Sequence, residues 1–304
     1  MSATRALVVG GGVMARGIAA QLAASGIHTD VLVRRREVVA PAEAEIRARS
    51  ARIGAHGGAV RVHASVGELE PPFGLAVESV AEELEAKREV LARAEGLLAD
   101  DGILTTNTSS LSLSALGEAL ARPERFAAWH WFNPAELVPL VEVVAAPRTA
   151  PAVVEHLLAL SRTIGKEPVA VRREVPGFVA NRLQYALLRE AYALVESGVC
   201  DVEDVDRAVV AGLGARWAAI GPFASMDAAG LAVHEAVAAR LFPELSRSTA
   251  VPALLRELRG QGATGAEGGS GLRGTYRPGA AHRLAEQRDA ILTLLGGARR
   301  ESAA

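Results

Sequence analysis

The chain has 304 residues, of which 50% are hydrophobic and 22% are charged, and its formal net charge at pH 7 is −2. This composition is typical of a soluble globular protein of two domains, and the charge gives no electrostatic case for binding nucleic acid or an anionic membrane surface. A single cysteine, Cys200, excludes an internal disulfide framework and a cysteine-based metal site. No apolar run reaches the roughly 18 residues of a membrane span. We therefore expect a cytoplasmic protein with no signal peptide, no membrane partner and no metal.

A glycine-rich turn follows the first expected strand, residues 6–9. It has the pattern G-x-G-x-x-A, formed by Gly10, Gly12 and Ala15. The first glycine permits a tight turn, the second leaves room for a pyrophosphate, and the alanine keeps the following helix close to the sheet. The free N–H groups of that helix would bind the phosphates. The turn therefore predicts a dinucleotide site rather than a plain strand–helix connection. The residues predicted to contact the dinucleotide here are Gly10, Gly12, Val13, Met14 and Ala15.

Three arginines, Arg34, Arg35 and Arg36, end the second expected strand, residues 29–33. An NAD-preferring site usually has Asp or Glu at this point, where the carboxylate binds the ribose hydroxyls. A carboxylate would repel a 2′-phosphate, whereas an arginine binds it in a bidentate manner, at about 1.5–3 kcal/mol for each charged hydrogen bond. The pattern predicts a preference for NADP(H) through Arg34 first and Arg35 second, with NAD(H) as the alternative cofactor. The competing interpretation is a solvated basic strand end.

Strand and helix patterns alternate over the next hundred residues. The expected helices cover residues 37–55, 82–94 and a segment that ends near residue 120. The expected strands cover residues 59–63, 75–80, 103–106 and 140–144. Such alternation predicts a doubly wound α/β fold with a parallel sheet.

The pattern changes after residue 171, and from residue 176 onward it predicts only helices. They cover residues 177–197, 202–211, 223–241, 249–260 and 279–296. A Gly-rich loop is expected over residues 262–274. We therefore predict an N-terminal Rossmann domain over residues 1–173 and an all-α C-terminal domain over residues 174–304, which would bind substrate and form a dimer.

Two polar blocks interrupt otherwise apolar sequence, at residues 107–110 and 130–134. Glu142 stands twelve residues beyond His130, inside an apolar strand. A buried carboxylate is costly without a partner, and the histidine is the obvious partner. A carboxylate fixes the tautomer of the imidazole that it holds, which produces a general acid–base group. From the residues alone, the alternative is a structural histidine and a solvated glutamate on an edge strand.

These blocks resemble the L-3-hydroxyacyl-CoA dehydrogenase superfamily, in the same order and with nearly the same spacing. The resemblance covers almost the whole chain, and its most specific segments are residues 107–110, 130–134 and 176–182. Residues 182–185 and 212–217 look closest to the branch that contains lambda-crystallin, L-gulonate 3-dehydrogenase and carnitine dehydrogenase. The resemblance implies an NAD(P)-dependent oxidoreductase that moves a hydride between nicotinamide C4 and a β-keto or 3-hydroxy acid or thioester.

The same resemblance implies roles for single residues and for the assembly. His130 would be the acid–base residue and Glu142 the carboxylate that orients it. Ser109 and Asn181 would hydrogen-bond the substrate oxygen. The residues implied to line the cofactor cleft are Glu82, Lys87, Asn107 and Asn133. The family also implies a homodimer formed through the helical domain.

Two departures from the family bear on the cofactor. Arg34 replaces the acidic ribose ligand, so NAD use cannot be carried over. Ser270 stands about where the family has a lysine that contacts the cofactor, and Arg273 is the candidate substitute.

Other departures bear on the substrate. The hairpin of helices that holds coenzyme A in acyl-CoA members is shortened or altered around residues 36–66. Trp129 and Trp131 replace smaller or phenyl side chains, and they either line the substrate pocket or fill the core. The substrate is therefore expected to be a small 3-hydroxy acid, a carrier-bound thioester or a free polyketide β-keto acid.

Three functions remain open from the sequence. The first is an NADP(H)-dependent ketoreductase, with bacterial polyketide biosynthesis as one setting. The second is an NAD-dependent dehydrogenase of the L-gulonate or carnitine type. The third is a catalytically silent, crystallin-like cofactor-binding protein, against which the intact residues Ser109, His130, Glu142 and Asn181 argue.

Overall fold

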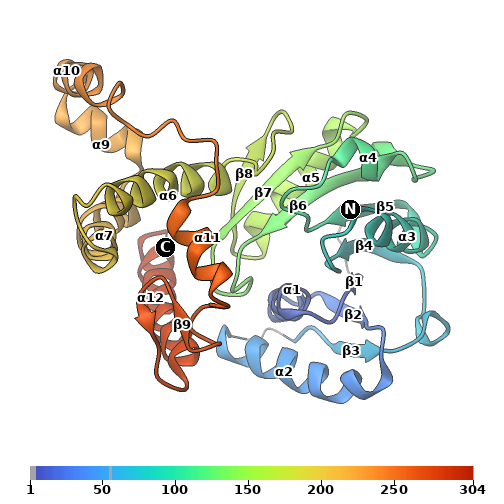
Figure 1. Cartoon of the computed structure of the whole chain (residues 1–304). Helices are drawn as coiled ribbons and strands as arrows, with labels where there is room; N and C mark the ends of the chain where they lie inside the picture. The colour runs from blue at the N-terminus through green and yellow to red at the C-terminus, as the bar shows by residue number, and fades with distance from the viewer. Residues whose placement is uncertain (1–4, 55–56, 304) are drawn as a thin grey trace. The chain divides into compact units, whose positions relative to one another are not determined.

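The computed structural model describes residues 5–54 and 57–303 (Figure 1). Contacts divide the chain into two compact units. The first comprises Met1–Ala180 and Arg288–Ala304, and the second comprises Asn181–Gln287. The dinucleotide turn and the two polar blocks all belong to the first unit.

An eight-stranded sheet with the order β3-β2-β1-β4-β5-β6-β7-β8 forms the centre of the first unit (Figure 1). Its strands are β1 (Arg5–Val9), β2 (His28–Leu32), β3 (Val60–His63), β4 (Phe73–Glu78), β5 (Leu98–Thr106), β6 (Phe126–Trp131), β7 (Leu140–Ala145) and β8 (Glu167–Val171). The first six strands of this order are parallel to one another. The doubly wound Rossmann sheet predicted from the sequence is confirmed.

The far edge of the sheet corrects one part of that prediction, because β7 runs antiparallel to β6. β8 is in turn parallel to β7. The described chain forms no helix between β6 and β7. A parallel neighbour needs a crossover of a dozen or more residues, whereas a short connection returns the chain antiparallel. This return places the predicted strand 140–144 directly beside the histidine block.

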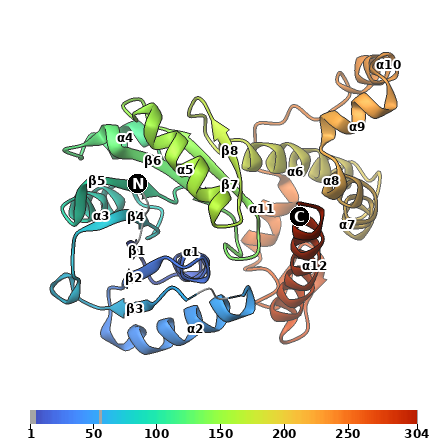
Figure 2. The ribbon, with the colours of Figure 1, turned by 180° about the vertical axis from the view of Figure 1, so that it is seen from behind.

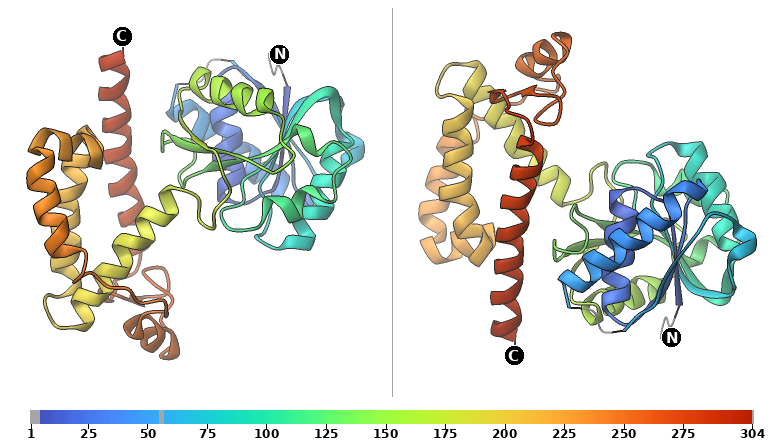
Figure 3. Two further views of the ribbon diagram at one scale, coloured as in Figure 1. Left: turned by 90° about the horizontal axis from the view of Figure 1, so that it is seen from above. Right: turned by 90° about the horizontal axis from the view of Figure 1, so that it is seen from below.

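Helices cover both faces of the sheet. α1 (Val13–Ala24), α2 (Val39–Arg52) and α5 (Pro151–Thr163) pack on one face, while α3 (Leu84–Glu95) and α4 (Leu113–Gly117) pack on the other. α1 and α2 lie side by side, as the two blue helices in Figure 3 show. Within β1 the side chains alternate: Ala6 and Val8 join one core, and Leu7 joins the other, as the period of a strand requires.

The predicted helix 37–55 has a different first turn and ends earlier than expected. It begins with a 3₁₀ turn, η1 (Arg36–Val38), continues as α2 and ends at Arg52. Its last predicted residue, Ala55, lies outside the described residues. Two further 3₁₀ turns, η2 (Val66–Glu68) and η3 (Pro123–Arg125), precede β4 and β6. Only residues 53–59 connect α2 to β3, so a second long helix has no room there.

Helices make up most of the C-terminal part of the chain (Figure 2). They are α6 (Ala180–Glu196), α7 (Val202–Ala208), the π-helical segment η4 (Val209–Gly214), α8 (Ala215–Ala219), α9 (Pro222–Ala229), α10 (Leu231–Leu241), α11 (Ala253–Gly260) and α12 (Ala280–Ala303). The predicted helix 223–241 is two helices, since Gly230 interrupts it with a φ of 95°. A short antiparallel hairpin, β9 (Ser270–Gly271) with β10 (Gly274–Thr275), overlaps the end of the predicted loop 262–274. Across the residues that the structure describes, no helix is both long and apolar enough to cross a membrane.

Candidate active site

The turn after β1 is shaped by Gly10, whose φ of 142° is disfavoured for residues with a side chain. A Cβ at this position would lie 2.3 Å from the carbonyl oxygen of Ser79. The backbone N–H of Gly10 donates to the Leu32 carbonyl at 3.0 Å. A Cβ at Gly12, in contrast, would meet no atom within 4 Å. The turn is therefore closed on the protein side and open at Gly12, where a ligand can approach the backbone.

The start of α1 provides the groups that an anion needs. Gly12 caps this helix without a side-chain hydrogen bond, and its first turn contains no acidic residue. Val13 is exposed, Met14 is half-buried and Ala15 is buried against the sheet. The N–H groups of this turn and the helix dipole therefore remain available to a phosphate. These residues fit the pyrophosphate of a dinucleotide.

The three arginines after β2 are all exposed. Arg35 Nε lies 3.5 Å from Glu37 Oε1, and Arg36 forms an ion pair with Glu68. Arg34 forms no hydrogen bond or ion pair with any residue between 5 and 54 or between 57 and 303. Its guanidinium is the one of the three that is available to a ligand.

Polar side chains connect the ends of neighbouring strands. The Asn107 amide reaches Ser79 Oγ at 3.5 Å, next to the dinucleotide turn. Its other side-chain atom, Oδ1, accepts a 2.8 Å hydrogen bond from the backbone N–H of Trp131, beside His130. Asn107 therefore joins the dinucleotide turn, the loop after β5 and the end of β6, which is the edge where doubly wound sheets bind ligands.

His130 and Glu142 form the pair that the sequence predicts. They lie directly opposite each other on β6 and β7, and His130 Nδ1 is 2.8 Å from Glu142 Oε2. Both side chains are buried. The aromatic rings of Phe132 and Phe178 contact the imidazole edge to face, at centroid distances of 4.5 and 5.5 Å. The structure forms no hydrogen bond to Nε2 from any described residue, so Nε2 is the atom that can meet a substrate.

The second oxygen of Glu142 is held by the chain that leads into α6. Glu142 Oε1 accepts hydrogen bonds from the N–H groups of Val179 at 2.9 Å and Ala180 at 2.8 Å. Gly177 and Phe178 have φ angles of 79° and 49°, which turn these two N–H groups toward the carboxylate. Burial raises the pKa of Glu142, but the hydrogen bonds from His130 and from the two N–H groups outweigh it and lower the pKa below its usual value.

Glu82, predicted to line the cofactor cleft, contacts the loop that carries Ser109. Its Oε1 accepts from Thr108 Oγ1 at 2.6 Å and from the Ser109 N–H at 2.9 Å. Burial raises the pKa of Glu82, while these hydrogen bonds and the Lys87 ammonium outweigh it and lower the pKa. Ser109 Oγ itself lies 3.5 Å from Glu82 Oε1.

The remaining predicted site residues are Lys87, Asn133 and Asn181. Lys87 is almost fully buried and binds Glu78, a carboxylate that the sequence interpretation missed. Asn133 is exposed in the loop after β6. Asn181 is the second residue of α6 and begins the second unit, so its substrate contact stays a prediction. Glu78 could have been found by the argument used for Glu142, because it is also a carboxylate within an apolar strand.

The two tryptophans beside His130 fill the core. Trp129 and Trp131 are both buried, and their rings meet edge to face at 4.7 Å. Trp129 Nε1 donates to Ser161 Oγ at 2.9 Å. Of the two interpretations from the sequence, core packing is correct.

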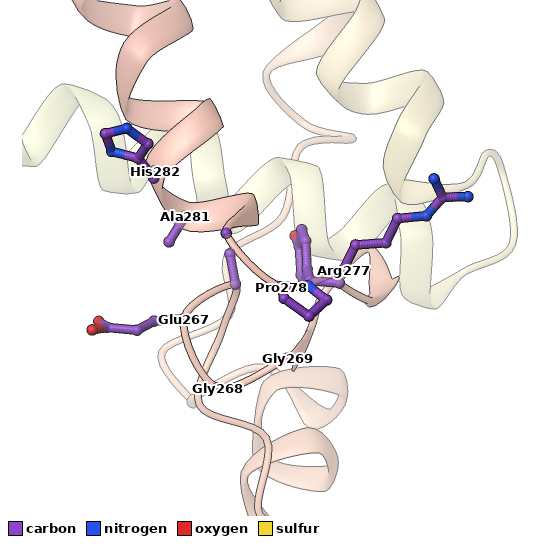
Figure 4. A pocket seen from close by; sticks show the side chains of 10 residues that line it. Glu267, Gly268, Gly269, Arg277, Pro278, Ala281 and His282 are labelled. Atoms are coloured by element: carbon purple, nitrogen blue, oxygen red, sulfur yellow. The ribbon is translucent and has the colours of Figure 1, made fainter.

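The second unit contains a hollow of about 610 Å³ between the β9–β10 hairpin and the start of α12. Glu267 and His282 extend from its lining to one side, and Arg277 extends to the other (Figure 4). Arg273, the candidate substitute for the family lysine, lies 3.7 Å from Asp206 and 3.9 Å from Glu203. Its guanidinium therefore pairs with carboxylates of its own unit. Within the described ranges, no cluster of three or more His, Cys, Asp or Glu side chains could hold a metal ion.

Comparison with known proteins agrees with this geometry. Residues 5–175 match the 3-hydroxyacyl-CoA dehydrogenase NAD binding domain, and residues 177–274 match the 3-hydroxyacyl-CoA dehydrogenase C-terminal domain. The chain therefore belongs to the 3-hydroxyacyl-CoA dehydrogenase family and contains an NAD-binding domain. The predicted family and the predicted oxidoreductase class, acting on a CH–OH group, are both confirmed.

Relatives from several branches are similar over most of the chain. A 5-formyl-3-hydroxy-2-methylpyridine 4-carboxylate 5-dehydrogenase from Mesorhizobium japonicum is 37% identical over 87% of this chain and 88% of its own length. An L-carnitine dehydrogenase from Streptomyces griseus is 35% identical over 74% and 70%. A solved structure of a 5-formyl-3-hydroxy-2-methylpyridine 4-carboxylic acid 5-dehydrogenase, an NAD⁺-dependent dismutase, superimposes with a TM-score of 0.91 over 98% of both chains, at 32% identity.

Proposed function

We propose that this protein transfers a hydride between a nicotinamide dinucleotide and a small β-keto or 3-hydroxy acid. The observation that carries the proposal is the buried His130–Glu142 pair, whose free imidazole nitrogen stands at the strand edge that also holds the dinucleotide turn. Intact acid–base residues argue against a silent cofactor-binding protein. We also propose a cytoplasmic location, which use of a nicotinamide pool favours.

The chemistry of the side chains follows from their hydrogen bonds. When bound, the nicotinamide supplies or accepts the hydride. His130 Nε2 gives a proton to the oxygen of a keto substrate during reduction and takes it from a hydroxyl during oxidation. Glu142 keeps Nδ1 protonated, so that Nε2 has the lone pair a base needs. Ser109 and Asn181 would donate hydrogen bonds to the substrate oxygen and stabilise charge on it.

Gly10, Gly12 and the first turn of α1, with Val13, Met14 and Ala15, would hold the pyrophosphate of the cofactor. Asn107 and Asn133 would line the rest of the cofactor cleft. We propose that Arg34, with Arg35 beside it, favours NADP(H) over NAD(H). The free guanidinium of Arg34 supports this preference, whereas the NAD⁺ dependence of the solved relative argues for the alternative.

We propose that the substrate is a free acid rather than a coenzyme A thioester. The short connection from α2 to β3 supports this, since it has no room for the helical hairpin that holds coenzyme A in acyl-CoA members of the family. A free β-keto acid also suits a reductive role in polyketide biosynthesis.

The decisive experiment is a cofactor and substrate matrix. NADPH and NADH are titrated against a free β-keto acid, a polyketide β-keto acid, acetoacetyl-CoA, L-carnitine and L-gulonate. We expect turnover of the free β-keto acids with NADPH and little turnover of the thioester. Oxidation of L-gulonate or L-carnitine alone, with NAD, would overturn the biosynthetic proposal.

Arg34→Asp tests the cofactor part separately. Loss of one or two charged hydrogen bonds predicts a drop of about 10- to 100-fold in the preference for NADPH. Arg36→Ala is the matched control, because that guanidinium is already paired with Glu68. An unchanged preference in Arg34→Asp would assign the arginines to a solvated strand end.

A second candidate substrate is a substituted pyridine carboxylate, as in the Mesorhizobium relative. The similarity over almost the full length of both chains supports it. Adding 5-formyl-3-hydroxy-2-methylpyridine 4-carboxylate with NAD⁺ to the matrix separates this candidate from the β-keto acids.

We further propose a homodimer formed through the helical unit. Large apolar side chains on its helices are exposed, among them Leu183, Tyr185, Phe223, Leu231 and Leu241. Exposed apolar surface of this kind is typical of a protein interface, and a second copy of the same chain is the partner that the family implies.

A further inference from the structure

A buried ion pair lies beneath the loop that carries Ser109. Lys87, on α3, is 1% exposed, and its Nζ lies 2.8 and 3.0 Å from the two carboxylate oxygens of Glu78 at the end of β4. Glu78 also accepts from the Val80 N–H at 2.6 Å and from Thr106 Oγ1 at 2.5 Å. Both oxygens of this buried carboxylate are satisfied, which fixes its orientation and that of the lysine.

The lysine also reaches a second carboxylate at the surface. Lys87 Nζ lies 3.3 Å from Glu82 Oε2, and the Glu82 side chain is 37% exposed. Because the cation holds Oε2 on the inner side, the other oxygen, Oε1, faces the loop after β5. Glu82 is thus the outer member of a network of ion pairs that begins at the buried Glu78 and passes through Lys87.

Glu82 Oε1 accepts hydrogen bonds from consecutive residues of the loop Asn107–Ser110. It accepts from Thr108 Oγ1 at 2.6 Å, from the Ser109 N–H at 2.9 Å and from the Ser110 N–H at 3.2 Å. Ser110 Oγ adds a fourth contact at 3.1 Å. One carboxylate oxygen therefore fixes the backbone conformation of the loop that carries Ser109.

We propose that Glu78 and Lys87 are positioning residues for the reaction, acting through Glu82 on the Asn107–Ser110 loop. Glu78 anchors the ammonium of Lys87, Lys87 orients the carboxylate of Glu82, and Glu82 holds the Ser109 and Ser110 N–H groups in place. The part of this inference that concerns catalysis rests on the proposed function. The simpler alternative is that Lys87 only neutralises the buried Glu78.

A charge-balanced double variant distinguishes the positioning role of Lys87 from simple neutralisation of Glu78. Lys87→Met alone would leave Glu78 buried without a cation, which destabilises the fold and gives no clear answer. Glu78→Gln/Lys87→Met removes both charges with side chains of similar size, so the fold keeps its packing while Glu82 loses its cation. If Lys87 only neutralises Glu78, this variant behaves as the wild type.

The first measurement is amide hydrogen exchange of Ser109 and Ser110 in the protein without substrate. We expect exchange at these two amides to be about tenfold faster in the double variant, with the strands of the sheet unchanged. Glu89→Gln/Arg93→Met is the matched control, because it removes an exposed ion pair from the same helix and should leave the loop unchanged. Exchange at the wild-type rate in both variants would overturn the proposal.

The second measurement is steady-state kinetics with the best substrate and saturating cofactor. A misplaced loop predicts a kcat lower by about tenfold or more, with the dissociation constant of the cofactor changed less than kcat. A wild-type kcat beside fast exchange would limit the network to loop stability and overturn its catalytic part. If the wild type itself turns over no substrate, the proposed function fails, while the exchange data still decide the positioning of the loop.

If the double variant does not fold, Glu78→Gln replaces it. Lys87 then keeps one carboxylate, Glu82, and is expected to draw it inward, away from the loop. The same amides should exchange faster than in the wild type, and unchanged exchange would again refute the proposal.

Discussion

His130 and Glu142 are direct cross-strand partners on the antiparallel strands β6 and β7, joined by a 2.8 Å contact between Nδ1 and Oε2. The carboxylate does not depend on the histidine for its own position, since the N–H groups of Val179 and Ala180 hold its other oxygen. The pair is therefore organised before any substrate arrives, which is the condition under which acid–base groups and their supporting hydrogen bonds are most effective.

Glu142→Gln is expected to reduce kcat by roughly 10²-fold or more. The glutamine oxygen can still accept from the two N–H groups, so its NH₂ group faces His130 Nδ1. A donor at that position favours the tautomer with the proton on Nε2, which cannot act as a base. Turnover in the oxidative direction and the free energy of unfolding are measured together.

The stability measurement is what makes this experiment informative. We expect the variant to stay folded, because glutamine has nearly the same shape and keeps one of its hydrogen-bonding roles. Turnover close to that of the wild type would contradict the assignment of Glu142 as the orienting carboxylate.

The sequence contained enough information to pair His130 with Glu142 but not to predict how they meet. A carboxylate inside an apolar strand needs a partner, and the histidine was the available one. The apolar run of β7 does not show its direction, because such a run has the same pattern in a parallel and an antiparallel strand; the short connection after β6 is the feature that indicates an antiparallel return. The hydrogen bonds from the Val179 and Ala180 N–H groups to Glu142 could not be predicted either. They depend on the left-handed backbone of Phe178, a conformation that phenylalanine rarely adopts.

The dinucleotide turn was predictable because glycine spacing reports directly on backbone geometry. The Glu78–Lys87 pair was not recognised as a unit, since a lysine is rarely buried in full, although Lys87 stands three residues after Leu84 and four before Leu91, on the buried face of α3. Only the fold shows that its side chain points beneath the strand ends, where a buried carboxylate compensates the charge.

Gly10→Ala and Gly12→Ala are expected to separate folding from cofactor binding. Gly10→Ala forces a Cβ against the Ser79 carbonyl at an unfavourable φ, which should lower the free energy of unfolding by about 2–4 kcal/mol. Gly12→Ala puts a methyl group into open space, so stability should change by no more than about 1 kcal/mol. Its cofactor affinity should fall instead, because the methyl group occupies the approach to the backbone. Urea unfolding and cofactor titration of both variants give the comparison, and a Gly12→Ala variant that binds cofactor normally would place the pyrophosphate elsewhere.

Lys166 should make stability depend on pH in the alkaline range. It is 5% exposed, its Nζ donates to the carbonyls of Ala135 and Val138, and burial lowers its pKa to about 7, with Glu136 opposing the shift. Between pH 7 and the usual lysine pKa near 10.5, the unfolded chain binds a proton that the folded chain does not. Stability therefore rises with pH in this window, by up to about 1.4 kcal/mol per pH unit, and the full cost of the buried charge remains below pH 7.

Lys166→Met removes this titration. Loss of the two carbonyl contacts adds an offset that does not depend on pH, so it cancels when two pH values are compared. Between pH 7 and pH 9 the free energy of unfolding of the wild type should rise by about 1–3 kcal/mol relative to that of the variant, as measured by urea unfolding. Parallel stability profiles would show that Lys166 keeps an ordinary pKa in the folded protein.

Exposed apolar side chains of the helical unit allow the proposed homodimer to be tested. Phe223 is 84% exposed and Leu231 is 65% exposed, on the neighbouring helices α9 and α10. If a second copy buries them, Phe223→Asp/Leu231→Asp places two charges in an apolar interface, where hot-spot positions contribute about 2 kcal/mol or more each. Analytical ultracentrifugation should then show a wild-type dimer and a monomeric variant at micromolar concentration. Val66→Asp, at an exposed apolar position of the first unit, is the control that should stay dimeric. A wild type that sediments as a monomer, or a double variant that remains dimeric, would rule out this face as the dimer interface.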